Sequence, residues 1–194
     1  MKTEFEAKFL NINIEDTRQK LTELGATLEQ PMRLMKRAII DNDFLKSKNA
    51  FVRIRDEGHK VSLTYKQFDD LSVDGAKEHE VVVSDFNETL ALLAAVGLVH
   101  KSLQESKRET WKHGNVEIVI DEWPWLNPYI EIEADSEATV KDFTEKLGFN
   151  WNDAVFGDVM AAYRVQYPHL GVDEKVSSIP NIKFGDPLPA MLQT

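Results

Sequence analysis

The stretch Glu4-Phe5-Glu6-Ala7-Lys8 alternates charged and apolar side chains near the start of the chain. In a β-strand, side chains at every second position point to the same face. Glu4, Glu6 and Lys8 would therefore share one face, and Phe5 and Ala7 the opposite one. The stretch predicts a strand that gathers two carboxylates and an ammonium group on one side and packs apolar side chains on the other.

The same alternation returns in later segments. These are Val52-Arg53-Ile54-Arg55, residues 61–66, residues 78–83, residues 116–121 and Tyr129-Ile130-Glu131-Ile132-Glu133. One interpretation is a set of antiparallel strands whose polar faces lie in water. Several strands carry paired acids or paired bases. This pattern instead favours an arrangement in which the charged faces point toward one another or toward a ligand.

Composition narrows the classes of function. The length of 194 residues favours one domain with a full core. The formal net charge of −10 disfavours a nucleic-acid partner, because phosphate backbones bind basic surfaces. No run approaches the roughly 18 apolar residues of a membrane span, so we expect no membrane association. The absence of cysteine excludes disulfides, thiolate zinc sites and cysteine nucleophiles, and it fits a cytoplasmic protein.

Periodicity and turn residues predict the order of elements. We expect strands over 3–13, 34–42, 50–56, 60–68, 77–83, 99–112, 115–122 and 128–134, and helices over 15–27, 86–97, 137–147 and 152–166, with Asp16 or Thr17 capping the first helix. About eight antiparallel strands favour an α+β fold, in which an eight-stranded antiparallel closed β-barrel has helices packed outside. The proline-containing tail from Pro168 has two open interpretations: a segment packed across a mouth of the barrel, or a poorly ordered end.

Such a barrel would turn the charged faces of its strands inward. The inward bases would be Lys8, Arg53, Arg55, Lys66, Lys107 and Arg108, and the inward acids Glu4, Glu6, Glu78, Glu80, Glu117, Asp121, Glu131 and Glu133. Buried charges must be paired or bound to a metal. Arg and Lys bind phosphate oxygens, and carboxylates bind hard divalent cations such as Mg²⁺ or Mn²⁺. This set of side chains is typical of metal-assisted phosphoryl transfer.

Glu4-x-Glu6-x-Lys8 resembles the ExExK signature of the CYTH superfamily, the triphosphate tunnel metalloenzymes. That family includes class IV adenylate cyclases, thiamine triphosphatases and inorganic triphosphatases. Further segments resemble its motifs in the family's order: 52–55 the LRxR strand, 63–66 the LTxK strand, 78–80 the second acidic pair, 106–111 the basic strand, and 121–124 with 129–133 the closing acidic segment. Ile39-Ile40-Asp41 departs from the Tyr-Phe-Asp of many members, which weakens an assignment of Asp41.

The resemblance covers roughly residues 1–165 and implies a tunnel that holds a triphosphate by its bases and one or two divalent ions by its acids. We therefore predict a CYTH tunnel domain over 1–167 and a C-terminal extension over 168–194. The predicted catalytic residues are Glu4, Glu6, Lys8 and Lys66; the substrate-binding residues are Lys8, Arg53, Arg55, Lys66, Lys107 and Arg108; the ligands of Mg²⁺ or Mn²⁺ are Glu4, Glu6, Glu80, Asp121, Glu131 and Glu133. Glu78 and Glu80 could also be partners of tunnel bases. Trp123 and Trp125 have two interpretations, rim packing or a stacking platform.

The predicted function is metal-dependent hydrolysis of a triphosphate, either inorganic tripolyphosphate or a small organic triphosphate. The partner is thus a small-molecule triphosphate, and a homodimer is an open expectation. One alternative is a class IV adenylate cyclase that converts ATP to cyclic AMP and pyrophosphate. The other is a polyphosphate-binding module without catalysis.

Overall fold

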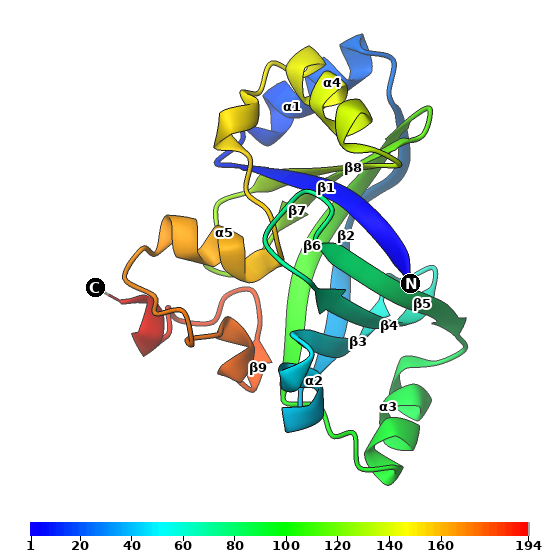
Figure 1. Cartoon of the computed structure of the whole chain (residues 1–194), viewed down its shortest axis with the longest axis vertical. Coiled ribbons are helices and arrows are strands. Elements are labelled where there is room, and N and C mark those ends of the chain that lie inside the picture. Colours follow the sequence, from blue (N-terminus) through cyan, green and yellow to red (C-terminus); the bar gives the residue numbers. More distant parts are fainter. Residues whose placement is uncertain (194) are drawn as a thin grey trace.

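The computed structural model describes residues 1–193, and its centre is a closed ring of eight antiparallel strands (Figure 1). The strands are β1 (Lys2–Leu10), β2 (Thr27–Ile40), β3 (Ala50–Asp56), β4 (Val61–Phe68), β5 (Ala76–Val83), β6 (Ser102–His113), β7 (Val116–Glu122) and β8 (Tyr129–Ala134). Their spatial order is β2-β3-β4-β5-β1-β8-β7-β6, and β6 pairs back onto β2 to close the ring. The predicted α+β fold with eight antiparallel strands closed on themselves is confirmed.

The alternation in β1 has the predicted orientation. Glu4, Glu6 and Lys8 line the interior of the ring, whereas Ala7 and Phe9 are buried in an apolar core on its outer side. Because the side-chain period of a strand is two residues, the register of β1 fixes both faces at once.

Helices cover the outer faces of the ring (Figure 1). α1 (Ile14–Glu23) and α4 (Glu137–Lys146) pack Leu21, Val140 and Phe143 into the same outer core as β1, β7 and β8. α3 (Phe86–Ala95) places Leu93 in a second core with residues of β3. α1 begins earlier than predicted, because the side chain of Asn13 accepts a hydrogen bond from the amide of Asp16 and so caps the helix.

β2 extends over fourteen residues, well beyond the predicted 34–42. Its first part pairs with β6, and its last residues pair with both β6 and β3. The register shifts between Leu28 and Gln30 and again between Gln30 and Arg33. The second shift spans Pro31, which has no amide hydrogen to donate. The sequence signal is weak here because this irregular half of the strand lacks clean alternation. The short helix α2 (Asp43–Ser47) follows β2 directly and was not predicted.

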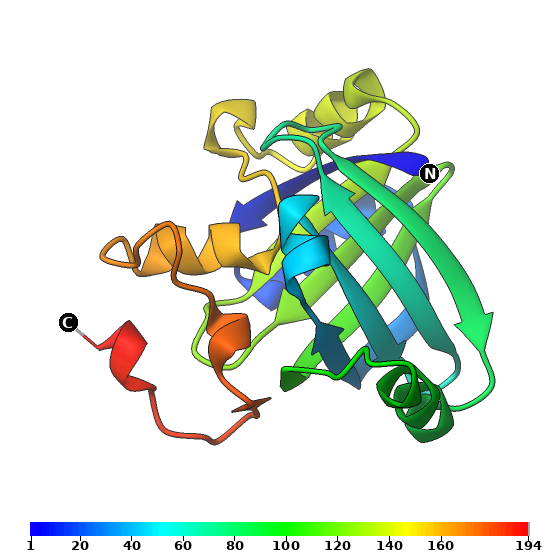
Figure 2. The same cartoon turned by 60° about the horizontal axis from the view of Figure 1, so that its bottom comes forward.

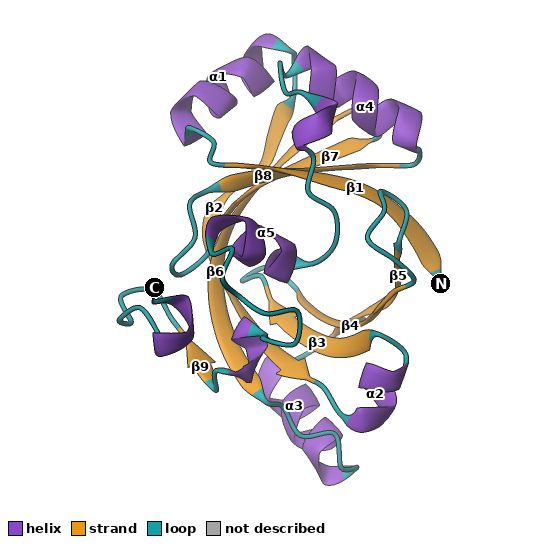
Figure 3. Ribbon diagram, turned by 60° about the vertical axis from the view of Figure 1, so that its left-hand side comes forward, coloured by secondary structure: helices purple, strands orange, loops and turns teal. Residues whose placement is uncertain are grey.

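A single helix was predicted over 152–166, but the structure has two separate helical elements in this region. They are η1 (Trp151–Asp153) and α5 (Val159–Gln166). The chain leaves the helical path between them because Val155 forms a β-bridge with Lys8, and Asp158 then caps α5. This bridge brings the start of α5 to one opening of the ring, which Figures 2 and 3 show from two sides.

The C-terminal tail packs against the ring, and this favours the ordered interpretation. It contains η2 (Val176–Ser178), β9 (Asn181–Ile182) and η3 (Ala190–Leu192). β9 pairs with β6 in parallel. Val176, Ile182 and Leu192 are buried in a third core together with residues of α5. Within the described part of the chain, no helix is both long enough and apolar enough to cross a membrane.

Candidate active site

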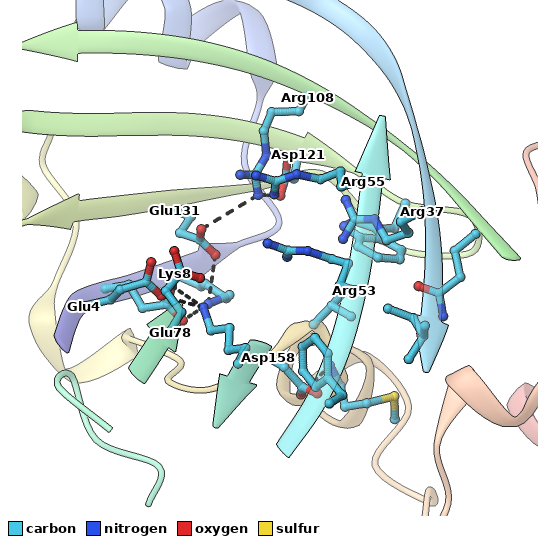
Figure 4. Close-up of a pocket in the computed structure, with 18 of the residues that line it drawn as sticks. Glu4, Lys8, Arg37, Arg53, Arg55, Glu78, Arg108, Asp121, Glu131 and Asp158 are labelled. Carbon is cyan, nitrogen blue, oxygen red and sulfur yellow. Dashed lines mark hydrogen bonds and ion pairs between the residues drawn. The ribbon is translucent and has the colours of Figure 1, made fainter. Parts of the chain in front are cut away.

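A cavity of about 300 Å³ runs inside the ring, and each of the eight strands contributes charged side chains to its wall. Acids and two lysines gather on one side, and arginines face them from the other (Figure 4). The charged residues that line it are Glu4, Glu6, Lys8, Arg37, Arg53, Arg55, Lys60, Lys66, Glu78, Glu80, Glu117, Arg108, Asp121, Glu131, Glu133 and Asp158. Every predicted site residue except Lys107 is in this set.

Two ammonium groups join three carboxylates on the acidic side. Lys66 Nζ lies 2.7 Å from Glu4 Oε2 and 3.4 Å from Glu6 Oε2. Lys8 Nζ lies 3.1 Å from Glu6 Oε1 and 2.8 Å from Glu131 Oε2. Burial by itself would lower the pKa of Lys8, but the carboxylates of Glu131 and Glu6 outweigh it and raise that pKa. Lys8 and Lys66 therefore stay charged and hold the three carboxylates together.

Glu78 adds a further carboxyl group to this side. Burial raises its pKa to about 7, and the hydrogen bond that it shares with Glu4 raises it too. Burial would also raise the pKa of Glu4, but the nearby Lys66 ammonium outweighs it and lowers that pKa. The side chain of Glu78 was expected to pair with a base or a metal; it instead lies against another acid. The acidic side thus carries more negative charge than its two lysines neutralise.

A hard divalent cation suits this excess of buried carboxylate oxygens. Glu4, Glu6 and Glu131, with Glu78 beside them, are the residues that would hold it. Among residues 1–193 no three acidic or histidine side chains stand in a group that could coordinate an ion as they are, because the lysine ammonium groups lie between the carboxylates. An ion would have to displace part of these lysine contacts, for which a bound phosphate chain offers new partners.

Two predicted metal ligands lie on the basic side of the cavity. Asp121 is fully buried, and both of its oxygens accept hydrogen bonds from Arg108. Glu80 accepts a hydrogen bond from Thr64 and lies 3.9 Å from Arg53 and Arg55. The geometry of Glu80 fits the alternative in which it is a partner of tunnel bases.

The guanidinium groups of the basic side repel one another. Burial lowers the pKa of Arg53 to about 10, and the neighbouring Arg55 contributes. Burial also lowers the pKa of Arg37, again with Arg53 and Arg55 contributing. The Nε atoms of Arg37, Arg53 and Arg55 are buried without a hydrogen-bond partner. Buried donors and depressed pKa values of this kind are what a bound anion would relieve.

Sequence reasoning missed Arg37. It lies in the part of β2 where the alternation is masked by Lys36, whose side chain points to the other face. Arg37 Nη2 donates a hydrogen bond to Ser106 Oγ at 2.7 Å, and its Cζ lies 4.2 Å from the ring centroid of Trp123. Trp123 is buried against this guanidinium, which supports packing over a free stacking platform.

Lys107 was predicted to bind substrate inside the cavity, but it does not line the cavity. It lies on the outer surface, where its Nζ is 3.9 Å from Glu122 Oε2 and 4.7 Å from the ring centroid of Phe184 in the tail. Adjacent residues of a strand point to opposite faces, so Arg108 and Lys107 cannot both enter the cavity. Arg108 is the inward residue.

Glu57, in the turn after β3, is buried although turns of this kind are usually exposed. It lies 2.8 Å from Arg55 Nη2 and 3.0 Å from Arg33 Nη2. Burial would raise the pKa of Glu57, but Arg55 and Lys60 outweigh it and lower it to about 2. Glu57 thereby fixes Arg55 from the end of the ring opposite α5.

Comparisons with known proteins found a matching family and several solved structures with a similar fold. The model of the CYTH domain matches residues 2–152. A putative adenylate cyclase from Vibrio parahaemolyticus has a similar structure, with a TM-score of 0.71 and 10% identity over 82% of this chain and 96% of that one. The PH1012 protein from Pyrococcus horikoshii has a TM-score of 0.66 and 22% identity, over 78% and 93% of the two chains.

A third similar structure is a protein from Hippeastrum, described as a putative adenylyl cyclase with a dominant triphosphatase activity. Its TM-score is 0.58, with 17% identity over 86% of this chain and 96% of that one. At these identities the likeness concerns the fold. No protein with a curated description matches this chain. The match over residues 2–152, together with the closed ring and its charged interior, shows that the chain belongs to the CYTH domain family.

Proposed function

We propose that this protein is a divalent-metal-dependent triphosphatase, which hydrolyses inorganic tripolyphosphate or a small organic triphosphate inside the ring. The observation that carries the proposal is the basic side of the cavity. Arg37, Arg53 and Arg55 have buried, unpartnered Nε atoms, and the pKa values of Arg37 and Arg53 are depressed. A polyanion between the arginines and the opposite lysines would satisfy these donors and remove the mutual repulsion.

The two sides of the cavity would have different roles, the basic side in binding phosphate and the acidic side in binding the metal ion. Arg53, Arg55 and Arg108 would bind phosphate oxygens and stabilise the negative charge that grows on them in the transition state. Glu4, Glu6 and Glu131 would hold the divalent ion, and Lys8 and Lys66 would shift from these carboxylates toward the phosphates. When bound, Mg²⁺ or Mn²⁺ would supply positive charge to the triphosphate and favour attack by water.

Two alternative functions would use the same cavity, and the experiment below distinguishes them from hydrolysis. A class IV adenylate cyclase would use the same cavity but expose the α-phosphorus of ATP to its own 3′ hydroxyl; the Vibrio protein of the same fold is described as a putative adenylate cyclase. A polyphosphate-binding module would keep the arginines and lack turnover. The dominant triphosphatase activity ascribed to the Hippeastrum protein favours hydrolysis for this chain as well.

The test is product analysis. Tripolyphosphate, thiamine triphosphate and ATP are each incubated with the protein and Mg²⁺ or Mn²⁺, and phosphate, pyrophosphate and cyclic AMP are followed. We expect phosphate and the matching diphosphate, and no release in excess EDTA. Cyclic AMP with pyrophosphate would assign the cyclase reaction instead, and binding of tripolyphosphate without any product would assign a binding module.

A further inference from the structure

The loop between β7 and β8, residues 123–128, connects the C-terminal tail to the basic side of the cavity. Its first residue, Trp123, lines the cavity, and the Cζ atom of Arg37 lies 4.2 Å from the centroid of its indole ring. Trp125, two residues further on, packs in the apolar core that the tail shares with α5. One tryptophan of the loop therefore contacts a cavity arginine, and the other contacts the tail.

Trp125 has a backbone conformation that is rare for a bulky residue. Its φ is +65°. The amide of Leu126 donates a hydrogen bond to the carbonyl oxygen of Trp123, which closes a tight turn with Pro124 at its second position. Glycine usually takes the third position of a turn where φ is positive. A bulky side chain there is strained, and the conformation persists only because surrounding contacts hold it.

Three hydrogen bonds from α5 and the tail hold Trp125 in this conformation. Its carbonyl oxygen accepts hydrogen bonds from Tyr167 Oη at 2.6 Å and from Gln166 Nε2 at 2.9 Å. Its indole Nε1 donates a hydrogen bond to the carbonyl oxygen of Asp186 in the tail at 2.9 Å. α5 and the tail lie on the same side of the ring (Figures 1 and 2). The turn is thus anchored from that side.

Arg37 gains a favourable contact from this arrangement. Burial and the neighbouring Arg53 and Arg55 lower the pKa of Arg37, and its Nε atom has no hydrogen-bond partner. The face of an indole ring attracts a cation, and the attraction is stronger where water is excluded. Trp123 therefore stabilises the charged guanidinium group that a polyanion would meet in the cavity. Because Trp123 is the first residue of the turn, its position depends on the turn.

We propose that Trp125 is a positioning residue: held by α5 and the tail, it keeps Trp123 against Arg37 and so keeps this guanidinium group in place for a bound triphosphate. Trp125 itself does not line the cavity. The inference rests on the proposed function, since it requires that Arg37 contacts phosphate. It gives a role to the tail, which lies beyond the matched family region that ends at residue 152.

The test uses two variants of the anchor. Trp125→Gly fits the positive φ and removes the indole ring, whereas Tyr167→Phe removes one hydrogen bond to Trp125 and keeps the aromatic ring. Each is made in the wild type, in Arg37→Gln and in Arg53→Ala. Binding of tripolyphosphate is measured by titration calorimetry in EDTA, so that no turnover occurs. Val172→Ala, at an exposed position of the tail, is the control.

We expect Trp125→Gly to weaken tripolyphosphate binding about tenfold, and Tyr167→Phe to weaken it less. The same losses should recur in the Arg53→Ala background and disappear in the Arg37→Gln background, because Trp125 acts through Arg37. A general loss of stability would not distinguish the two backgrounds. Val172→Ala should change nothing. An equal loss in the Arg37→Gln background, or unchanged affinity in Trp125→Gly, would overturn the inference.

A second measurement needs no ligand. The indole Nε1 of Trp123 is buried without a hydrogen-bond partner, and exchange of its proton with deuterium is followed by NMR, with Trp123→Phe assigning the resonance. We expect faster exchange in Trp125→Gly and Tyr167→Phe but not in Val172→Ala. An unchanged rate in Trp125→Gly would refute the link between the two tryptophans. If the wild type binds no tripolyphosphate, the proposed function fails, and the exchange rates still decide whether Trp125 holds Trp123.

Discussion

Arg108 and Asp121 face each other through two hydrogen bonds, from Nε to Oδ1 at 2.7 Å and from Nη2 to Oδ2 at 2.6 Å. They are opposite residues on β6 and β7. Burial would lower the pKa of Arg108, but Asp121 outweighs it and raises that pKa. Because both oxygens of Asp121 accept hydrogen bonds from Arg108, this carboxylate orients an arginine toward the cavity.

This relationship predicts the effect of Asp121→Asn. Removing one charge from a buried pair should lower the free energy of unfolding by about 3 kcal/mol. The KM for tripolyphosphate should rise, because Arg108 is no longer held, while the concentration of Mg²⁺ needed for half-maximal rate stays the same. Urea denaturation and a Mg²⁺ titration measure the two effects. A large shift in the Mg²⁺ requirement would instead support Asp121 as a ligand of the metal ion.

Glu4→Gln and Glu6→Gln should each abolish turnover without unfolding the protein. Both carboxylates lie at the acidic side, where negative charge is in excess, so loss of one charge removes a cation ligand and leaves the packing in place. Circular dichroism checks the fold and phosphate release checks turnover. Glu122→Gln, on the outer surface beside Lys107, is the matched control and should keep full activity. Normal rates for either tunnel variant at limiting Mg²⁺ would refute the metal assignment.

Arg53→Ala and Arg55→Ala should weaken tripolyphosphate binding, each by about 1.5–3 kcal/mol, because each removes charge-assisted hydrogen bonds to phosphate. Calorimetry on the single variants and the double variant gives the values. Lys107→Ala provides the control within the same set of predicted bases, since Lys107 lies outside the cavity. Unchanged affinity in the double variant, or a comparable loss in Lys107→Ala, would contradict the placement of the phosphate.

Glu57 predicts a pH dependence of stability. Its pKa is about 2 in the folded protein, below the ordinary value of 4.5. A depressed carboxyl pKa stabilises the fold above about pH 4.5, and this stabilisation is lost as the pH falls from 4.5 toward 2. Glu57→Gln should therefore be less stable than the wild type at pH 7, by up to about 3 kcal/mol, and the difference should shrink by pH 3. Urea denaturation curves at several pH values measure it, and a difference independent of pH would contradict the ion pairs.

Ending the chain after Leu170 should lower the melting temperature. The cut removes Val176, Ile182 and Leu192 from the core that they share with α5, and it removes the pairing of β9 with β6. Leu188→Ala, at a partly exposed position of the tail, should by contrast have a small effect. Thermal melts compare the two, and an unchanged melting temperature after truncation would mean that the tail adds nothing to stability.

The closed ring of strands and most residues of its interior could be predicted from the amino-acid sequence. Alternation in β1, β3 and β8 fixes which side chains share a face, because the period of a strand is two residues and one face must be apolar. Glu4, Glu6, Lys8, Arg53, Arg55 and Glu131 could therefore be grouped on common faces from this alternation, and the expected closed ring of strands placed those faces inside. The caps Asp85 and Ser136 were likewise predictable from local turn chemistry.

Which charged side chains pair with one another depends on the three-dimensional arrangement of the strands. Asp121 pairs with Arg108 and Glu57 with Arg33 because the closing of the ring brings their strands and turns together. The same pattern of alternation cannot distinguish Lys107 from Arg108, since one residue of slip exchanges the two faces. The bridge between Lys8 and Val155, which aims α5 at the opening and so brings Asp158 and Ser177 into the wall, joins segments almost the whole chain apart. Such contacts depend on how the chain closes in space, and no local period in the sequence encodes them.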